Sequence, residues 1–145
     1  MRVLFVGNSH TYFHDMPALF ARMCGELTGE RPEVTMLAYS GRSLAWHREE
    51  YFALRFALLR GGYDYCVIQQ QAHPFPGEEP TEAGVRAILA LCERTGTRPV
   101  LYMTWAEKAK PENAAVIGAT ATFAVEELPG GVLAVETDEG RVLLH

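Results

Sequence analysis

Short apolar runs alternate with longer amphipathic stretches along the first two thirds of the chain. The runs at 2–7, 33–41, 63–71 and 98–105 are rich in β-branched and aromatic residues, which is typical of buried strands. The stretches between them, at 11–29, 43–62 and 80–96, place apolar residues on one helical face. This order of elements predicts a parallel sheet with helices on both faces, because parallel strands are joined by crossover helices.

The last third of the chain has a weaker pattern. Residues 112–128 predict a helix, and residues 131–145 predict two short strands around a turn at 138–140. We interpret these strands as a hairpin rather than a further strand–helix–strand unit. The length of 145 residues, with no linker and no repeat, predicts a single domain over 1–145.

Composition narrows the class of protein. The chain is 48% hydrophobic with a net charge of −5, and it carries no basic stripe, so nucleic acid is not an expected partner. No segment has the length of a signal peptide or a membrane span, which predicts a cytoplasmic protein without a membrane partner. The three cysteines, Cys24, Cys66 and Cys92, form no C-x-x-C pair, which predicts buried free thiols in a reducing compartment.

Polar residues gather where the predicted strands end. They are Gly7 to His10 after the first strand, Tyr39 to Arg42 after the second, Gln69 to His73 in the third, and Thr104 and Trp105 in the fourth. Ligands of an open parallel sheet bind beyond the carboxyl ends of the strands. Four polar strand ends on one edge therefore predict a site there.

Ser9 is the candidate nucleophile of this site. It lies at a strand-to-helix turn, where unpaired backbone N–H groups stabilise the oxyanion that forms when a serine attacks a carbonyl. The alternatives are a serine that only caps the helix and a loop that holds phosphate. The loop has neither G-x-x-x-x-G-K nor G-x-G-x-x-G, and no cofactor is expected.

Three blocks carry a resemblance to a known family. "VLFVGNSHTYFHDMP", "AYSGRSLAWH" and "YDYCVIQQQAHPFP" together are similar to the SGNH/GDSL hydrolase superfamily, in a branch with GNS in place of GDS. The resemblance implies a flavodoxin-like three-layer α/β/α sandwich with a mainly parallel sheet and an abbreviated C-terminal part. It also implies Ser9 as nucleophile, and an oxyanion hole formed by the N–H groups of Ser9 and Gly41 and a side-chain amide. Gln69 is the first choice for that amide and Gln71 the second, because this chain has glutamines where most of the superfamily has asparagine.

The base that would activate the serine does not follow from the motifs. The superfamily supplies it from an Asp-x-x-His block, and no histidine of this chain has an acidic residue three places before it. His73 at the sheet edge, His10 beside the nucleophile and the terminal His145 are the candidates. His10 and His14 have the spacing of two metal ligands on a helix, but no third ligand is evident and no metal is expected.

Two functions remain open at this point. One is a serine esterase acting on a small acyl ester, such as an acetyl or carbohydrate ester. The other is a catalytically silent domain of the same fold that binds a small ligand or dimerises. A truncated C-terminal part would leave an edge or a face of the sheet uncovered, so we expect a homodimer.

Overall fold

The computed structural model describes residues 1–115, 117 and 132–134. Within them, a sheet runs in the order β2–β1–β3–β4–β5, and every neighbouring pair of strands is parallel. The strands are β1 (Arg2–Gly7), β2 (Glu33–Ala38), β3 (Tyr65–Gln69), β4 (Arg98–Tyr102) and β5 (Val132–Ala134). The predicted parallel sheet is confirmed, and its strand order is that of flavodoxin-like folds.

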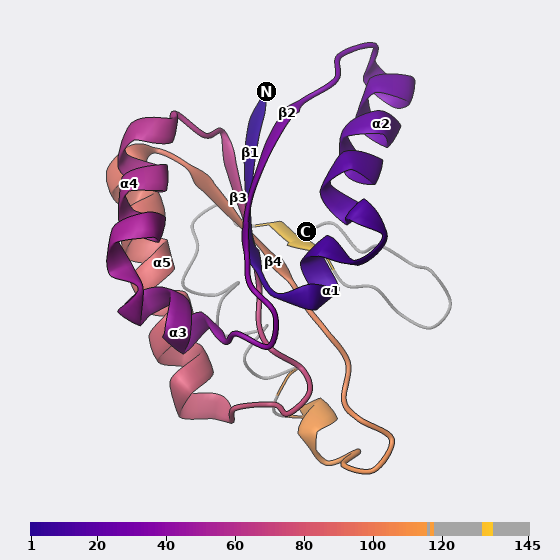
Figure 1. Ribbon diagram of the computed structural model, residues 1–145, viewed down its shortest axis with the longest axis vertical. Coiled ribbons are helices and arrows are strands. Elements are labelled where there is room, and N and C mark those ends of the chain that lie inside the picture. Colours follow the sequence, from indigo (N-terminus) through magenta and orange to yellow (C-terminus); the bar gives the residue numbers. More distant parts are fainter. Residues whose placement is uncertain (116, 118–131, 135–145) are drawn as a thin grey trace.

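Helices cover both faces of the sheet, as Figure 1 shows. On one side lie α1 (Ser9–Tyr12) and α2 (Met16–Thr28), joined by a 3-10 turn at Phe13–Asp15. On the other side lie α3 (Leu44–Glu49), α4 (Tyr51–Gly61) and α5 (Glu78–Thr95). The predicted three-layer α/β/α architecture is therefore confirmed.

Two of the predicted helices are divided. The helix expected over 11–29 already begins at Ser9 and is interrupted by the 3-10 turn, where His14 has a φ of 56° and Asp15 a φ of 53°. His10 and His14 therefore do not share the face of one regular helix. The helix expected over 43–62 is divided at Glu50, whose ψ of 46° is not helical.

The central strand forms the middle of the core. In β1, all four residues from Val3 to Val6 are at most 2% exposed, because the strand has a neighbour on each side and helices on both faces. Close packing of α3 on α5 depends on Gly84, where an added Cβ would lie 2.7 Å from the Cβ of Leu44. Cys66 and Cys92 are buried in this core as free thiols, while Cys24 is half-buried.

The interpretation of residues 131–145 as a hairpin rather than part of a further strand–helix–strand unit is wrong for residues 132–134. Residues 132–134 form β5, which pairs with β4 in parallel, as Val100 with Val132 and Tyr102 with Ala134. A parallel neighbour requires a crossover connection, so residues 132–134 add a further parallel strand to the sheet. The second predicted strand, the turn at 138–140 and most of the helix predicted over 112–128 lie outside the described residues.

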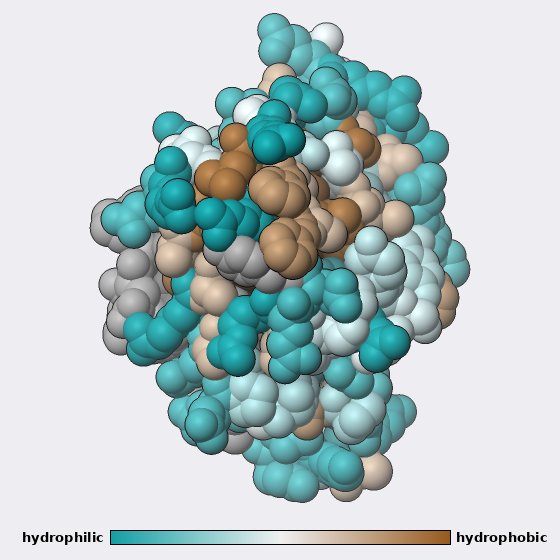
Figure 2. Space-filling view, turned by 60° about the vertical axis from the view of Figure 1, so that its left-hand side comes forward, coloured by the Kyte–Doolittle hydropathy of each residue, from teal (hydrophilic) through white to brown (hydrophobic). Residues whose placement is uncertain are grey.

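The surface over α4 carries a patch of exposed apolar side chains. In Figure 2, which brings the side of α3, α4 and α5 forward, hydrophobic side chains gather on this face, and the exposed ones of α4 are Phe52, Phe56 and Leu59. The expected homodimer stays a prediction. No helix within the described ranges is long and apolar enough to cross a membrane.

Candidate functional site

The carboxyl ends of β1, β2, β3 and β4 lie at the same edge of the sheet, because the strands are parallel. Four segments leave the sheet there: the turn at 8–9, the second loop (39–43), the third loop (70–77) and the fourth loop (103–111). Every site residue predicted from the sequence lies at or just beyond one of these strand ends, apart from His145, which lies outside the described residues.

Asn8 holds the turn that presents Ser9. Its side-chain oxygen accepts a hydrogen bond from the backbone N–H of His10 at 3.1 Å, so Asn8, and not Ser9, is the N-cap of α1. Its side-chain nitrogen donates to the carbonyl oxygen of Arg42 at 3.0 Å. Asn8 is 1% exposed, whereas Ser9 is half-buried at the surface. The buried amide of Asn8 therefore ties the second loop to the turn, and Ser9 itself is only half-buried there.

The second loop places Gly41 at the same edge. The loop is anchored where the N–H of Tyr39 donates to the carbonyl oxygen of Gly7, and it turns where the N–H of Arg42 donates to Tyr39. Gly41 has a φ of 63°, a conformation that favours glycine. Within the described part of the chain, the N–H of Gly41 makes no hydrogen bond, so it is free to donate to a ligand.

Gln69 lies beneath the turn rather than at its surface. Its side-chain oxygen accepts from the backbone N–H of Asn8 at 3.1 Å and from the hydroxyl of Thr11 at 2.9 Å, and its side-chain nitrogen donates to the carbonyl oxygen of Gln70. At 1% exposure, it supports the turn from below. Gln71, the second choice for an oxyanion donor, is half-buried at the sheet edge.

The side chain of Gln70 also makes its hydrogen bonds inside the protein. Its oxygen accepts from the backbone N–H groups of Leu44 and Gln71, and its nitrogen donates to the hydroxyl of Thr81 at 2.8 Å. These bonds join the third loop to the starts of α3 and α5. The sequence could not distinguish the three consecutive glutamines, because their different roles arise from neighbours that are distant along the chain.

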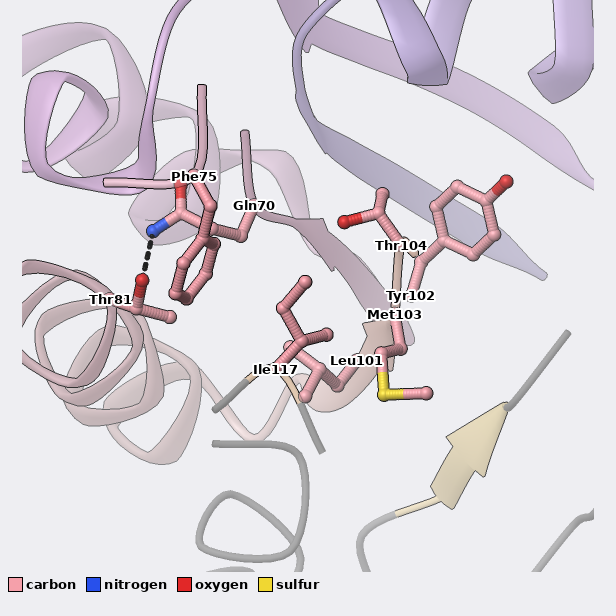
Figure 3. Close-up of a pocket in the computed structure, with 8 residues that line it drawn as sticks. All are labelled: Gln70, Phe75, Thr81, Leu101, Tyr102, Met103, Thr104 and Ile117. Carbon is pink, nitrogen blue, oxygen red and sulfur yellow. Dashed lines mark hydrogen bonds between the residues drawn. The ribbon is translucent and has the colours of Figure 1, made fainter. Parts of the chain in front are cut away.

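Figure 3 shows the cavity beside Gln70, between the end of β4 and the start of α5. Its volume is about 20 Å³, enough for one water-sized group, and apolar side chains form most of its wall. The residues that line it are Gln70, Phe75, Thr81, Leu101, Tyr102, Met103, Thr104 and Ile117.

His10 and His73 come together at the edge of the sheet. Their ring centroids are 5.5 Å apart, and the ring of Trp105 also lies 5.5 Å from His10. Burial, and then the charge of His73, lower the pKa of His10 below its usual value. Nδ1 of His73 lies 3.3 Å from a carboxylate oxygen of Glu107 in the fourth loop. Sequence analysis did not single out Glu107, since it stands 34 residues beyond the histidine that it meets.

His47 is a further buried residue of this region that sequence analysis did not place in the site. It is 2% exposed, and its Nε2 lies 2.7 Å from the carbonyl oxygen of Gly7. Because a carbonyl only accepts, Nε2 carries the proton. Burial lowers the pKa of His47, and the bond to Gly7 offsets this in part. His47 thus fixes the end of β1 immediately before Asn8 and Ser9.

Metal ligands do not gather at this edge within the described ranges. No group of three or more His, Cys, Asp or Glu side chains lies close enough there to hold an ion. What the edge does present is a half-buried serine, a backbone N–H without a partner among the described residues, and a histidine–carboxylate pair. This set of groups is suited to acyl transfer through a serine.

Solved structures share this fold. TesA matches with a TM-score of 0.76 at 13% identity, over 92% of this chain and 77% of that chain. The psychrotrophic esterase EstA from Pseudoalteromonas sp. matches with a TM-score of 0.70 at 12% identity, over 91% of this chain and 75% of that chain. AlinE4, an SGNH-hydrolase family esterase, matches with a TM-score of 0.72 at 12% identity, over 87% of this chain and 71% of that chain. No family model matches the chain, and no curated protein matches it.

The chain therefore has the fold of SGNH-hydrolase esterases, and the resemblance seen in the three sequence blocks is confirmed at the level of the fold. At 12–13% identity, this likeness concerns the arrangement of strands and helices. The chemistry of this chain has to be argued from its own residues.

Proposed function

We propose that this protein is a serine esterase that cleaves small acyl esters, with Ser9 as the nucleophile. The observation that carries the proposal is the bond from the side chain of Asn8 to the carbonyl oxygen of Arg42 at 3.0 Å. It joins the turn that bears Ser9 to the loop that bears Gly41, so that a hydroxyl and a free N–H lie at one edge of a fold shared with esterases.

In the proposed reaction, the oxygen of Ser9 attacks the ester carbonyl, and the N–H groups of Ser9 and Gly41 stabilise the oxyanion of the tetrahedral intermediate. Donors held in place before the reaction stabilise that charge without reorganisation.

For the third oxyanion donor we choose the side chain of Gln71 over that of Gln69. The side-chain amide of Gln69 is buried and bonded to Asn8, Thr11 and Gln70. Gln71 is only half-buried, and its side-chain amide has no hydrogen-bond partner within the described part of the chain.

The direct test is hydrolysis of p-nitrophenyl acetate by the wild type and by Ser9→Ala. We expect the variant to lose nearly all activity, because the nucleophile is absent. Ser40→Ala is the matched control, since Ser40 is an exposed serine of the second loop, and it should retain the wild-type rate. Equal turnover by the wild type and Ser9→Ala would show that Ser9 is not the nucleophile.

A second candidate function is a catalytically silent domain that binds a small ligand. The observation that favours it is the absence of an acidic residue three places before any histidine of the chain. A fluorophosphonate probe separates the two candidates, and a phosphonate is a suitable choice because EstA was solved inhibited by monoethylphosphonate. Stoichiometric labelling of the wild type that Ser9→Ala loses and Ser40→Ala keeps supports the esterase. No labelling supports the silent domain.

A further inference from the structure

The histidine–carboxylate pair lies next to the turn of the proposed nucleophile. The ring of His73 packs edge-on against the ring of His10, the residue that follows Ser9, with 5.5 Å between the centroids. Its Nδ1 lies 3.3 Å from Glu107. The side chains of His73 and Glu107 are 32% and 29% exposed, so both are partly buried and still reached by water. The third and fourth loops thus meet at the start of α1, the helix that begins with Ser9.

A carboxylate beside a histidine favours the tautomer in which the imidazole can act as a base. A carboxylate accepts and cannot donate, so the proton of a neutral His73 belongs on Nδ1, where it faces Glu107. Nε2 then carries a lone pair and can accept a proton. A serine hydroxyl needs such a base, itself oriented by a third group, to become a nucleophile near neutral pH.

His10 is less suited to this role, although it is adjacent to Ser9. Both residues belong to α1, and neighbouring side chains on a helix point in different directions. The ring of His10 packs between His73 and Trp105, and no carboxylate orients it within the described part of the chain. We therefore assign His10 to the wall of the site.

We propose that His73 is the general base of the esterase reaction and that Glu107 is the residue that positions it. This inference rests on the proposed function. The pair takes the place of the Asp-x-x-His block of the superfamily and comes from the third and fourth loops. The two residues therefore join the end of β3 to the end of β4 in a single catalytic unit.

The proton balance follows from these positions. Nε2 of His73 takes the proton of the Ser9 hydroxyl as the oxygen attacks, and the electron pair of the carbonyl moves to its oxygen. When the intermediate collapses, the alcohol leaves with the proton held by His73, and the acyl group stays on Ser9. Water then attacks the acyl-enzyme, gives one proton to His73 and releases the carboxylic acid. His73 finally returns that proton to the Ser9 oxygen.

The surface beside the pair is open to water. His73, Trp105 and Glu107 line, together with Ala106 and Lys108, a broad hollow of about 580 Å³. Among the residues that the structure describes, the charged and titratable groups around His73 are Glu107 and Lys108 from the fourth loop and His10 from α1. This hollow gives the leaving alcohol a way out and the hydrolytic water a way in.

The test compares the hydrolysis of p-nitrophenyl acetate by the full chain and by variants of the pair. We expect His73→Ala to lower kcat by about 10²–10⁴, the usual contribution of a general base. Added imidazole should restore part of the rate in His73→Ala but none in Ser9→Ala. Glu107→Gln should lower kcat by a smaller factor, and Glu107→Asp should retain more activity than Glu107→Gln.

Matched controls are available at exposed positions outside the site. His14→Asn and Glu112→Gln remove the same types of side chain and should leave kcat unchanged. His73→Gln keeps a donor for Glu107 and a similar volume but cannot accept the serine proton, so it separates a loss of base from a loss of fold.

Each outcome has a distinct meaning. An active wild type, an inactive Ser9→Ala and a folded His73→Gln at full rate would overturn the role of His73 and leave the proposed esterase intact. An inactive wild type that no phosphonate labels would overturn both. If the His73 variants melt below the assay temperature, equal kcat in the wild type, Glu107→Gln and Glu107→Asp would overturn the inference.

Discussion

Asn8 and Gln69 are joined by a hydrogen bond of 3.1 Å from the backbone N–H of Asn8 to the side-chain oxygen of Gln69. Because Gln69 is the last residue of β3 and Asn8 follows β1, this bond fastens the turn of Ser9 to the neighbouring strand. Both residues are 1% exposed, so water cannot replace either partner. The position of the candidate nucleophile therefore depends on an amide buried beneath it.

The first prediction concerns this amide. Gln69→Met keeps a similar length but leaves the N–H of Asn8 and the hydroxyl of Thr11 without an acceptor. Each buried polar group without a partner costs about 1–3 kcal/mol, so for these two groups we expect a loss of about 2–6 kcal/mol in the free energy of unfolding. Urea denaturation measures it. Gln71→Ala is the control, and a loss in Gln69→Met no larger than in Gln71→Ala would contradict the supporting role.

The second prediction concerns the close packing of Thr11 and Gln69 against Gly7. A Cβ at this position would lie 2.3 Å from the hydroxyl oxygen of Thr11 and 2.6 Å from the side-chain oxygen of Gln69. Gly7→Ala should therefore displace the bonds under the turn and destabilise the protein by about 1–3 kcal/mol. Esterase activity should fall with it, because the Ser9 turn moves.

Gly25 in α2 provides the matched control for Gly7. A Cβ there would meet Arg31 at 3.4 Å, an ordinary contact, and alanine is preferred to glycine inside a helix by about 0.5–1 kcal/mol. Gly25→Ala should leave activity unchanged and raise the thermal midpoint slightly. A Gly7→Ala protein as stable as Gly25→Ala would show that the neighbours of Gly7 can move without cost.

The third prediction tests the oxyanion donor of the second loop. Gly41 has a φ of 63°, and nothing lies within 4 Å of an added Cβ, so Gly41→Ala introduces conformational strain of roughly 1–2 kcal/mol and no clash. Relief of that strain would turn the N–H away from the site. We expect hydrolysis of p-nitrophenyl acetate to fall toward the factor of about 10²–10³ that follows loss of an oxyanion donor.

Gly29→Ala is the matched control, because it introduces the same backbone strain at a position outside the site. It ends α2 with a φ of 78°, and it also has nothing within 4 Å of an added Cβ. Gly29→Ala should cost similar stability while keeping the wild-type rate. Equal rates in Gly41→Ala and Gly29→Ala would argue against the N–H of Gly41 as a donor.

The fourth prediction is a dependence of stability on pH. Burial lowers the pKa of His47 in the folded protein below the usual 6.5. As the pH falls through 6.5, the unfolded chain takes up a proton at His47 that the folded chain does not, so the free energy of unfolding decreases. His47→Gln, which can still donate to Gly7, should lose less stability between pH 7.5 and pH 5.5.

Urea unfolding of both proteins at the two pH values measures this difference. His14→Asn serves as the control at an exposed histidine. The same decrease in the wild type and in His47→Gln would mean that His47 contributes nothing to the pH dependence.

Much of the fold follows from local pattern. The central strand was predictable at 2–7 because it is apolar throughout, which is the pattern of a strand buried on both faces. The break at Glu50 was not predictable, since apolar residues continue on both sides of it. The parallel pairing of β5 was also missed, because a short apolar strand has the same sequence pattern in a hairpin and in a crossover.

The candidate site likewise contains residues that the sequence indicated and residues that it could not. Ser9 and Gly41 were proposed as site residues from their places after strands and from the resemblance, and they stay predictions. The pairing of His73 with Glu107 could not be found, because 34 residues separate them and only the adjacency of β3 and β4 brings their loops together. Gln69 and Gln71 are chemically identical, and burial alone gives them different roles.

The sequence by itself determined which residues form strands and where polar groups leave the sheet, because both depend on the periodicity of neighbouring side chains. The tertiary structure alone decided which of those polar groups are buried as supports and which meet at the surface. That choice depends on contacts between segments distant in the chain, which local periodicity does not encode.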